Sequence, residues 1–225
     1  MATTDYDFSL TRAKIIEQAY IKIGALGLGQ TLPGEMSVQG SLALNMLVKE
    51  WQTKDIFLWQ LVQGTTVFAA DTTSKAMDNS VLGVEKAWYK SGTNDVEISV
   101  ISYRRYLEEI AKEVSSQYPY YIAVDNHITT PTMYIWPQPT AELTVYHLTI
   151  TRLKDMDTSG ATPDVPQRFY MALVYGLATI LADDFGLPVR ERDYIKSQYN
   201  EYLFEAMKSD REFEDITVSE PAYDS

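Results

Sequence analysis

The sequence has 225 residues, no cysteine and a formal net charge of −12, with 19 Lys and Arg against 31 Asp and Glu. This charge argues against a protein that grips nucleic-acid phosphates, because that affinity comes from clustered Lys and Arg. The lack of cysteine excludes disulfides, zinc ribbons and thiol chemistry together. The N-terminus lacks the basic start and apolar core of a signal peptide, and no run is apolar for long enough to cross a membrane, so we expect synthesis in a cytoplasm.

Residues 1–60 predict a pair of helices. Ser9 or Thr11 can cap the first helix, which carries its apolar residues on one face and ends in a glycine-rich segment. The second helix begins near Ser37, and its apolar side chains recur at helical spacing as far as Trp51. We expect the two helices to pack antiparallel.

Between residues 61 and 152 the period of the apolar residues changes from near 3.6 to 2, which indicates strands. The sequence Ser-Gly-Thr-Asn at 91–94 is a hairpin signal, and Ser102 can cap a short helix over residues 103–112. A polar loop is expected over residues 71–80. The segment therefore predicts an inserted antiparallel β module. Its expected strands are 65–69, 84–90, 96–101, 120–124, 133–136 and 143–151.

Residues 153–208 predict a second helical pair, which follows a polar linker. Residues 169–182 are almost wholly apolar, and a helix without a polar face must be buried on nearly every side. Gly-Leu-Pro at 186–188 favours a left-handed stop followed by a new, amphipathic helix that ends near Met207. Along the first of these helices, small residues and one carboxylate recur where another backbone could approach closely. These are Ala172, Gly176, Thr179 and Asp183.

Residues 209–225 form an acidic tail in which Arg211 is the only cation. Such a composition cannot build a core, so we expect the tail to be disordered in the free chain and to order only against a partner. Alternating apolar residues favour an extended arm over a helix. The candidate anchors are Phe213, Ile216, Val218 and Tyr223.

The predicted elements follow the order helix, helix, β module, helix, helix and tail. We predict an α+β fold in which both ends of the chain build one four-helix bundle and the antiparallel β module is inserted between them. The predicted parts are residues 1–60, 61–152, 153–208 and 209–225.

No catalytic, cofactor-binding or metal-binding residue is predicted, and we expect no enzyme. His127 lies in an expected turn, and His147 lies in a strand, where membership of a cross-strand pair is the simpler interpretation. The adjacent carboxylates at 108–109 and 183–184 point about 100° apart on a helix, so they do not converge. A glycosidase needs only two carboxylates at a suitable separation, which sequence spacing does not exclude.

Several segments, taken in order, carry a resemblance to one family. They are IKIG at 21–24, LNML at 44–47, Trp51, DIFL at 55–58, YIWPQP at 134–139, DVPQRF at 164–169, ALVYGLA at 172–178 and DDFG at 183–186. The chain resembles the head-to-tail adaptor proteins of tailed phages, which extend the portal in short-tailed phages. The likeness covers roughly residues 9–208 and rests on packing motifs, whose order carries it. The pair Asp183-Asp184 departs from the family, which often has a Pro-Glu-like pair there.

This resemblance implies a structural protein of the virion, at the head-tail junction. It implies a ring of identical subunits, usually a dodecamer, between the portal protein and the tail tube or nozzle protein, with packaged DNA crossing the lumen. By the same resemblance, the stripe from Ala172 to Asp183 becomes a candidate subunit interface, and the tail becomes an arm that docks on the portal. The net charge agrees with a ring through which DNA passes. A charge of −12 on each subunit, repeated round a ring, would repel phosphates and let DNA pass without specific binding.

Two alternatives remain open. Trp88, Trp136 and the strand tyrosines also suit a monomeric carbohydrate- or peptide-binding module that would bind its ligand through the β face. A lytic hydrolase would instead require a pair of carboxylates in a cleft.

Overall fold

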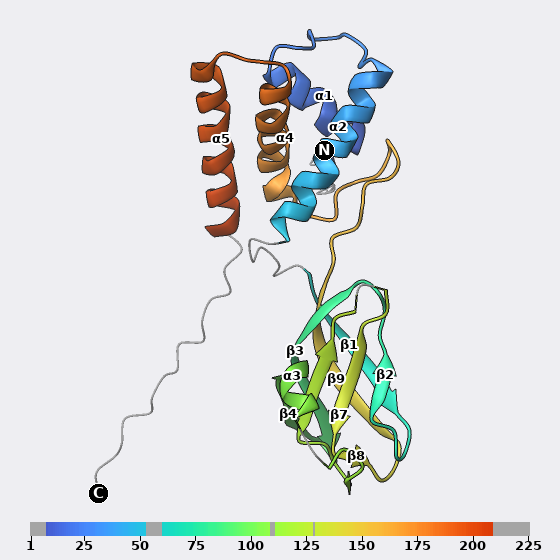
Figure 1. Cartoon of the computed structure of the whole chain (residues 1–225). Helices are drawn as coiled ribbons and strands as arrows, with labels where there is room; N and C mark the ends of the chain where they lie inside the picture. Colours follow the sequence, from blue (N-terminus) through green and yellow to red (C-terminus); the bar gives the residue numbers. More distant parts are fainter. Residues whose placement is uncertain (1–7, 53–59, 109–110, 128, 209–225) are drawn as a thin grey trace, which may run out of the picture. The chain divides into compact units, whose positions relative to one another are not determined.

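The computed structural model describes residues 8–52, 60–108, 111–127 and 129–208 (Figure 1). The chain forms two compact units. A helical unit contains the described residues up to Leu44 and those from Pro166 onward, and a β unit contains the described residues from Asn45 to Val165. The division falls within one helix.

Five α-helices are described, and the four at the two ends of the chain pack together, as predicted. In the helical unit, α5 and α2 lie on opposite sides, with α1 and α4 between them (Figure 1). The helices are α1 (Arg12–Lys22), α2 (Gly34–Trp51), α4 (Tyr170–Asp184), which follows a short 3-10 turn (Gln167–Phe169), and α5 (Val189–Lys208).

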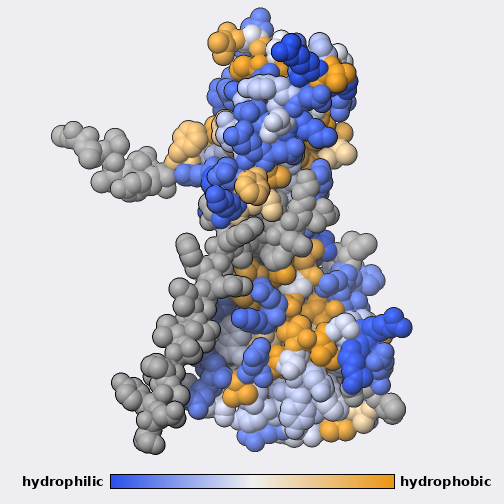
Figure 2. Space-filling model, turned by 90° about the vertical axis from the view of Figure 1, so that its left-hand side faces the viewer, coloured by the Kyte–Doolittle hydropathy of each residue, from blue (hydrophilic) through white to orange (hydrophobic). Residues whose placement is uncertain are grey.

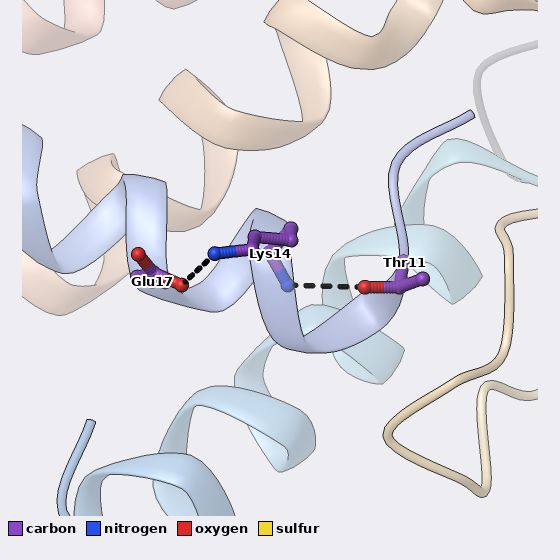
Figure 3. A network of polar contacts seen from close by, with 3 residues as sticks. All are labelled: Thr11, Lys14 and Glu17. Carbon is purple, nitrogen blue, oxygen red and sulfur yellow. Dashed lines mark hydrogen bonds and ion pairs between the residues drawn. The ribbon is translucent and has the colours of Figure 1, made fainter. Parts of the chain in front are cut away.

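Helix α1 begins where its capping residue dictates. The Thr11 side chain accepts a hydrogen bond from the backbone N–H of Lys14 at 3.4 Å, which satisfies one of the unpaired donors of the first turn (Figure 3). One turn further on, the Lys14 ammonium forms an ion pair with Glu17 at 2.8 Å. The prediction that Ser9 or Thr11 caps this helix is confirmed for Thr11.

Helix α4 is buried along most of its length, as its continuous apolar sequence predicts. The chain then turns at Gly186, whose φ of 64° is the left-handed conformation that glycine adopts without strain. Helix α5 starts directly after Pro188. Its apolar stripe faces inward, as predicted, with these residues buried: Ile195, Tyr199, Leu203 and Ala206.

Helices α1 and α2 approach each other closely at Gly40. A Cβ atom at this position would lie 2.5 Å from Cγ2 of Ile16 and 3.3 Å from Cε2 of Tyr20. The Tyr20 hydroxyl donates a hydrogen bond to the carbonyl oxygen of Met36 at 2.9 Å, which ties the same two helices together. Glycine is therefore required here by the lack of space, although it lowers helix propensity.

The β unit holds a sheet of seven strands in the order β1-β9-β3-β4-β6-β7-β2. The strands are β1 (Leu61–Phe68), β2 (Ser74–Ala76), β3 (Val81–Ser91), β4 (Asn94–Ser102), β6 (Tyr121–Asp125), β7 (Thr132–Trp136) and β9 (Leu143–Thr151). A smaller pair, β5 (Ser115–Ser116) and β8 (Gln138–Pro139), lies apart from this sheet.

The prediction of an antiparallel module is wrong in one respect, because the sheet is mixed. Strands β4 and β6 run parallel, with Val100 opposite Ile122. The chain between them carries α3 (Tyr103–Leu107), which gives it the length needed to return to the same end of the sheet. Ser102 caps α3 as predicted, but the helix ends five residues before the predicted end at Lys112.

The predicted polar loop over residues 71–80 contains the edge strand β2, which pairs with β7. Because the edge strands β1 and β2 also contact each other, the sheet is nearly closed. Its interior is apolar, and the buried members of this core come from six strands. They are Phe68, Ala87, Tyr89, Ile98, Ile122, Met133, Ile135 and Val145.

Candidate assembly surfaces

The four residues of the predicted small-residue stripe lie in different environments. Ala172 and Gly176 are buried within the helical unit, where α4 packs against α1 and α5. Thr179 is half-buried, and its hydroxyl donates to the carbonyl oxygen of Tyr175 at 2.8 Å. Asp183 is exposed. Participation of any of the four in a subunit contact stays a prediction.

The carboxylates at the end of α4 have separate partners within the chain. Asp183 forms an ion pair with Arg192 of α5 at 2.6 Å, and Asp184 accepts a hydrogen bond from Gln39 of α2 at 3.0 Å. Both contacts fasten the end of α4 to its neighbouring helices. Burial, and after it the charge of Asp184, raises the pKa of Tyr20.

Helix α2 exposes large apolar side chains along one line. Val38 is 73% exposed, Leu42 is 65% exposed and Met46, which continues the line, is 64% exposed. Their spacing of four residues places them on one face of the helix. A charged residue, Glu35, lies one turn before Val38 and is also exposed. The part of this face that belongs to the helical unit, Glu35 to Leu42, is called the α2 stripe below.

The end of α1 and the start of α5, with Tyr175 of α4, line an open hollow of about 630 Å³. Its lining is mainly apolar with two cations, Lys22 and Arg190, and one carboxylate, Glu191. The Lys22 ammonium lies 5.1 Å from the ring centroid of Tyr175. Tyr194 also lines the hollow and is 63% exposed. Figure 2 shows other hydrophobic side chains among hydrophilic ones on the α5 side of the unit.

Both histidines lie in the elements predicted for them, one in a turn and one in a strand. His127 lies in the exposed turn between β6 and β7. His147 pairs across the sheet with Gly64 of β1 and Ala87 of β3. It is buried, its Nε2 lies 2.9 Å from the Thr66 hydroxyl, and its Nδ1 has no hydrogen-bond partner among the described residues.

Gly64 makes room for the ring of His147. A Cβ atom at Gly64 would lie 2.7 Å from Cε1 of the imidazole. Burial lowers the pKa of His147, so the ring is neutral at neutral pH. In the described part of the chain, no three His, Cys, Asp or Glu side chains gather as they would around a metal ion.

The aromatic residues that suggested a ligand-binding module stack on one another. Trp88 stacks on Tyr146, with ring centroids 6.0 Å apart, and Trp136 stacks on Tyr121 at 5.7 Å. The indole N–H of Trp136 donates to the carbonyl oxygen of Ala111 at 2.9 Å. These contacts use ring faces that a sugar would otherwise cover.

A second aromatic cluster joins α3 to the sheet. Tyr103 and Tyr106 of α3 each lie 5.1 Å, centroid to centroid, from Tyr134 of β7. Burial, followed by the effect of Tyr103, raises the pKa of Tyr134 to about 12. Tyr134 therefore remains uncharged at neutral pH, and the cluster serves packing.

Sequence analysis did not single out the α2 stripe, although its signal was readable. Three apolar residues at spacings of four belong to one helix face, and the buried residues Leu44 and Leu47 occupy the other. The pattern alone did not separate a core face from an exposed one. The predicted anchors of the tail, Phe213, Ile216, Val218 and Tyr223, lie outside the described residues.

Comparison with known proteins gives one family. The model of the family described as SU10 adaptor protein matches residues 38–218, most of the chain. A comparison with curated proteins gave no match. In the described residues, no helix combines the length and the apolar character needed to cross a membrane.

Proposed function

Because the chain belongs to the SU10 adaptor protein family, whose phage adaptors have a structural role, we propose that it forms the ring that joins the portal to the tail of a phage. The family match over residues 38–218 is the observation that carries this proposal. The resemblance described above adds the finer details, namely a closed ring, contact with the portal protein on one side and with the tail tube or nozzle on the other.

The charge of the chain supports a lumen through which DNA passes. A net charge of −12 per subunit, repeated round a ring, gives a surface that repels phosphates. A channel for DNA works best without binding it, since each phosphate contact would hold the moving duplex. We therefore propose passage of DNA without specific binding.

The acidic tail is proposed as the arm that docks on the portal. Residues 209–225 carry apolar anchors among carboxylates, a composition that orders only when a partner covers it. The partner groove would provide apolar pockets for the anchors and cations for the carboxylates. The family match includes residues up to 218 and therefore most of these anchors.

The test is the mass of the purified protein, measured alone and mixed with the portal protein of the same phage. We expect a monomer in isolation and a complex with several copies on the portal. If the protein stays monomeric with the portal but binds an oligosaccharide or a peptide, the adaptor proposal is wrong and the binding-module alternative is favoured.

A further inference from the structure

The helical unit exposes apolar side chains on α2 and around the hollow between α1 and α5. The α2 stripe is carried by α2, and the hollow, with Tyr194 in its lining, is formed by the end of α1, the start of α5 and Tyr175 of α4. Helices α2 and α5 lie on opposite sides of the unit (Figure 1). Contiguous exposed apolar surface commonly marks a protein contact. Here there are two such surfaces, and they differ in shape, since the stripe protrudes from a helix and the hollow is recessed.

We propose that the α2 stripe of one copy of this chain packs into the α1–α5 hollow of the next copy. This inference rests on the proposed ring and names the surfaces that close it. A contact between two unlike faces of the same subunit is head-to-tail, and such contacts generate rings when the rotation closes. A contact of α2 with α2 would instead close at a dimer and leave the hollow uncovered.

The chemistry of the two surfaces is complementary. Val38 and Leu42 project from consecutive turns of α2, and the hollow offers apolar walls from Ile21 and Leu187. Its volume of about 630 Å³ lies within the range of pockets that take several side chains or a ligand. Exposed Tyr194 is the kind of rigid aromatic side chain that anchors protein contacts.

The charges of the two surfaces also favour this contact. Glu35 stands one turn before Val38 at the start of the stripe, and two cations, Lys22 and Arg190, line the hollow against Glu191 alone. An acidic helix start would thus enter a hollow with a surplus of positive charge. The attraction also sets the direction of the contact, because the reverse placement would bring Glu35 away from both cations.

The natural chain has no cysteine, so every disulfide formed by variants contains only introduced thiols. We would prepare full-length Leu42→Cys, Tyr194→Cys and the double variant, and oxidise them with and without the portal protein. We expect that each single variant alone gives little covalent dimer and that the mixture of the two gives one dimer band. The double variant should give a ladder of covalent multimers.

The matched control is the double variant Thr93→Cys with Tyr194→Cys. Thr93 is exposed in the β3–β4 turn of the other unit, so this variant should give no ladder of covalent multimers. When Glu35→Arg is added to the double-cysteine variant, the yield of covalent multimers should fall about fivefold, the factor that ~1 kcal/mol represents. Adding Arg190→Glu as well should restore that yield.

Efficient dimers of either single variant alone would overturn the proposal, since they indicate a contact between like faces. Absence of the mixed dimer would also overturn it. If rings are nevertheless seen by mass and by electron microscopy, another pair of surfaces closes them and the proposed function stands. If no multimer forms on the portal at all, the proposed function fails as well.

Discussion

The close approach of α1 and α2 at Gly40 gives a sharp test of the packing of the helical unit. Gly40→Ala would place a methyl group 2.5 Å from Cγ2 of Ile16. Normal contacts between carbon atoms are about 3.5–4.0 Å, so the new atom would overlap by about 1 Å. Cγ2 belongs to a fully buried β-branched residue, and such residues strongly prefer one χ1 rotamer in a helix, so moving it aside requires an unfavourable rotamer or a shift of α1.

Two opposing effects decide the size of the change. Alanine in place of glycine favours the helix by about 1 kcal/mol, and overpacking of a buried contact costs about 1–3 kcal/mol. Because the overlapped group is rigid, we expect the second effect to dominate and the free energy of unfolding to fall by about 1–2 kcal/mol. Gly34→Ala is the matched control, because no atom lies within 4 Å of its added Cβ, and it should lose nothing.

The assay is urea unfolding followed by far-ultraviolet circular dichroism, which reports on the helices. A double variant sharpens the result: Ile16→Ala leaves a cavity that the methyl group introduced by Gly40→Ala partly fills, so the two changes together should cost less than their sum. If Gly40→Ala is as stable as the natural chain, or if the two changes simply add, the close approach of α1 and α2 at this point is refuted.

The remaining predictions concern the β unit, the α1 cap, the tail and catalysis. The lowered pKa of His147 means that, as the pH falls, the unfolded chain takes up a proton at this residue before the folded chain does. The free energy of unfolding should therefore be highest above about pH 6.5 and fall below it. His147→Leu should flatten this part of a plot of the free energy of unfolding against pH. Thr11→Ala should lower the free energy of unfolding by about 1 kcal/mol in urea titrations, whereas Thr11→Ser should keep most of it. Deletion of residues 210–225 should leave the circular dichroism unchanged and sharply weaken portal binding in pull-down experiments at moderate salt; equally tight docking would mean that the tail has no such role. The purified protein should not hydrolyse peptidoglycan, DNA or polysaccharide, and activity that disappears in Asp183→Asn would contradict this.

The sequence predicted those parts of the fold that local signals specify. Helix α5 followed from its 3.6-residue stripe, the hinge from Gly186 and Pro188, and the β3–β4 hairpin from Gly92 with its polar neighbours. Pairing between distant strands has no such local signal. The parallel register of β4 and β6 depends on where the chain returns after α3, and the three residues of β2 are too few to show a period.

The candidate surfaces were less predictable than the elements that carry them. The stripe from Ala172 to Asp183 was identified by residue size, but size alone does not say whether a close contact lies within one subunit or between two. In the structure Ala172 is wholly buried inside the helical unit, and Asp183 is bound to Arg192. Exposure of Val38 and Leu42 is a tertiary property, since it depends on which face of α2 the other helices cover.

The pairing of β1 with β9 has a consequence for how such a chain can change. These are the first and last strands of the sheet in sequence, and they lie side by side with Leu61 opposite Ile150. The chain therefore enters and leaves the sheet at neighbouring points, and two strand partners in this position have Cα atoms about 5 Å apart. A segment with adjacent ends can be lengthened, shortened or exchanged for another fold while the flanking chain keeps its path. The sheet is therefore a segment that can be removed without rerouting the flanking chain. A short linker from Gln60 to Thr151 would be the simplest way to make a minimal helical version of the protein.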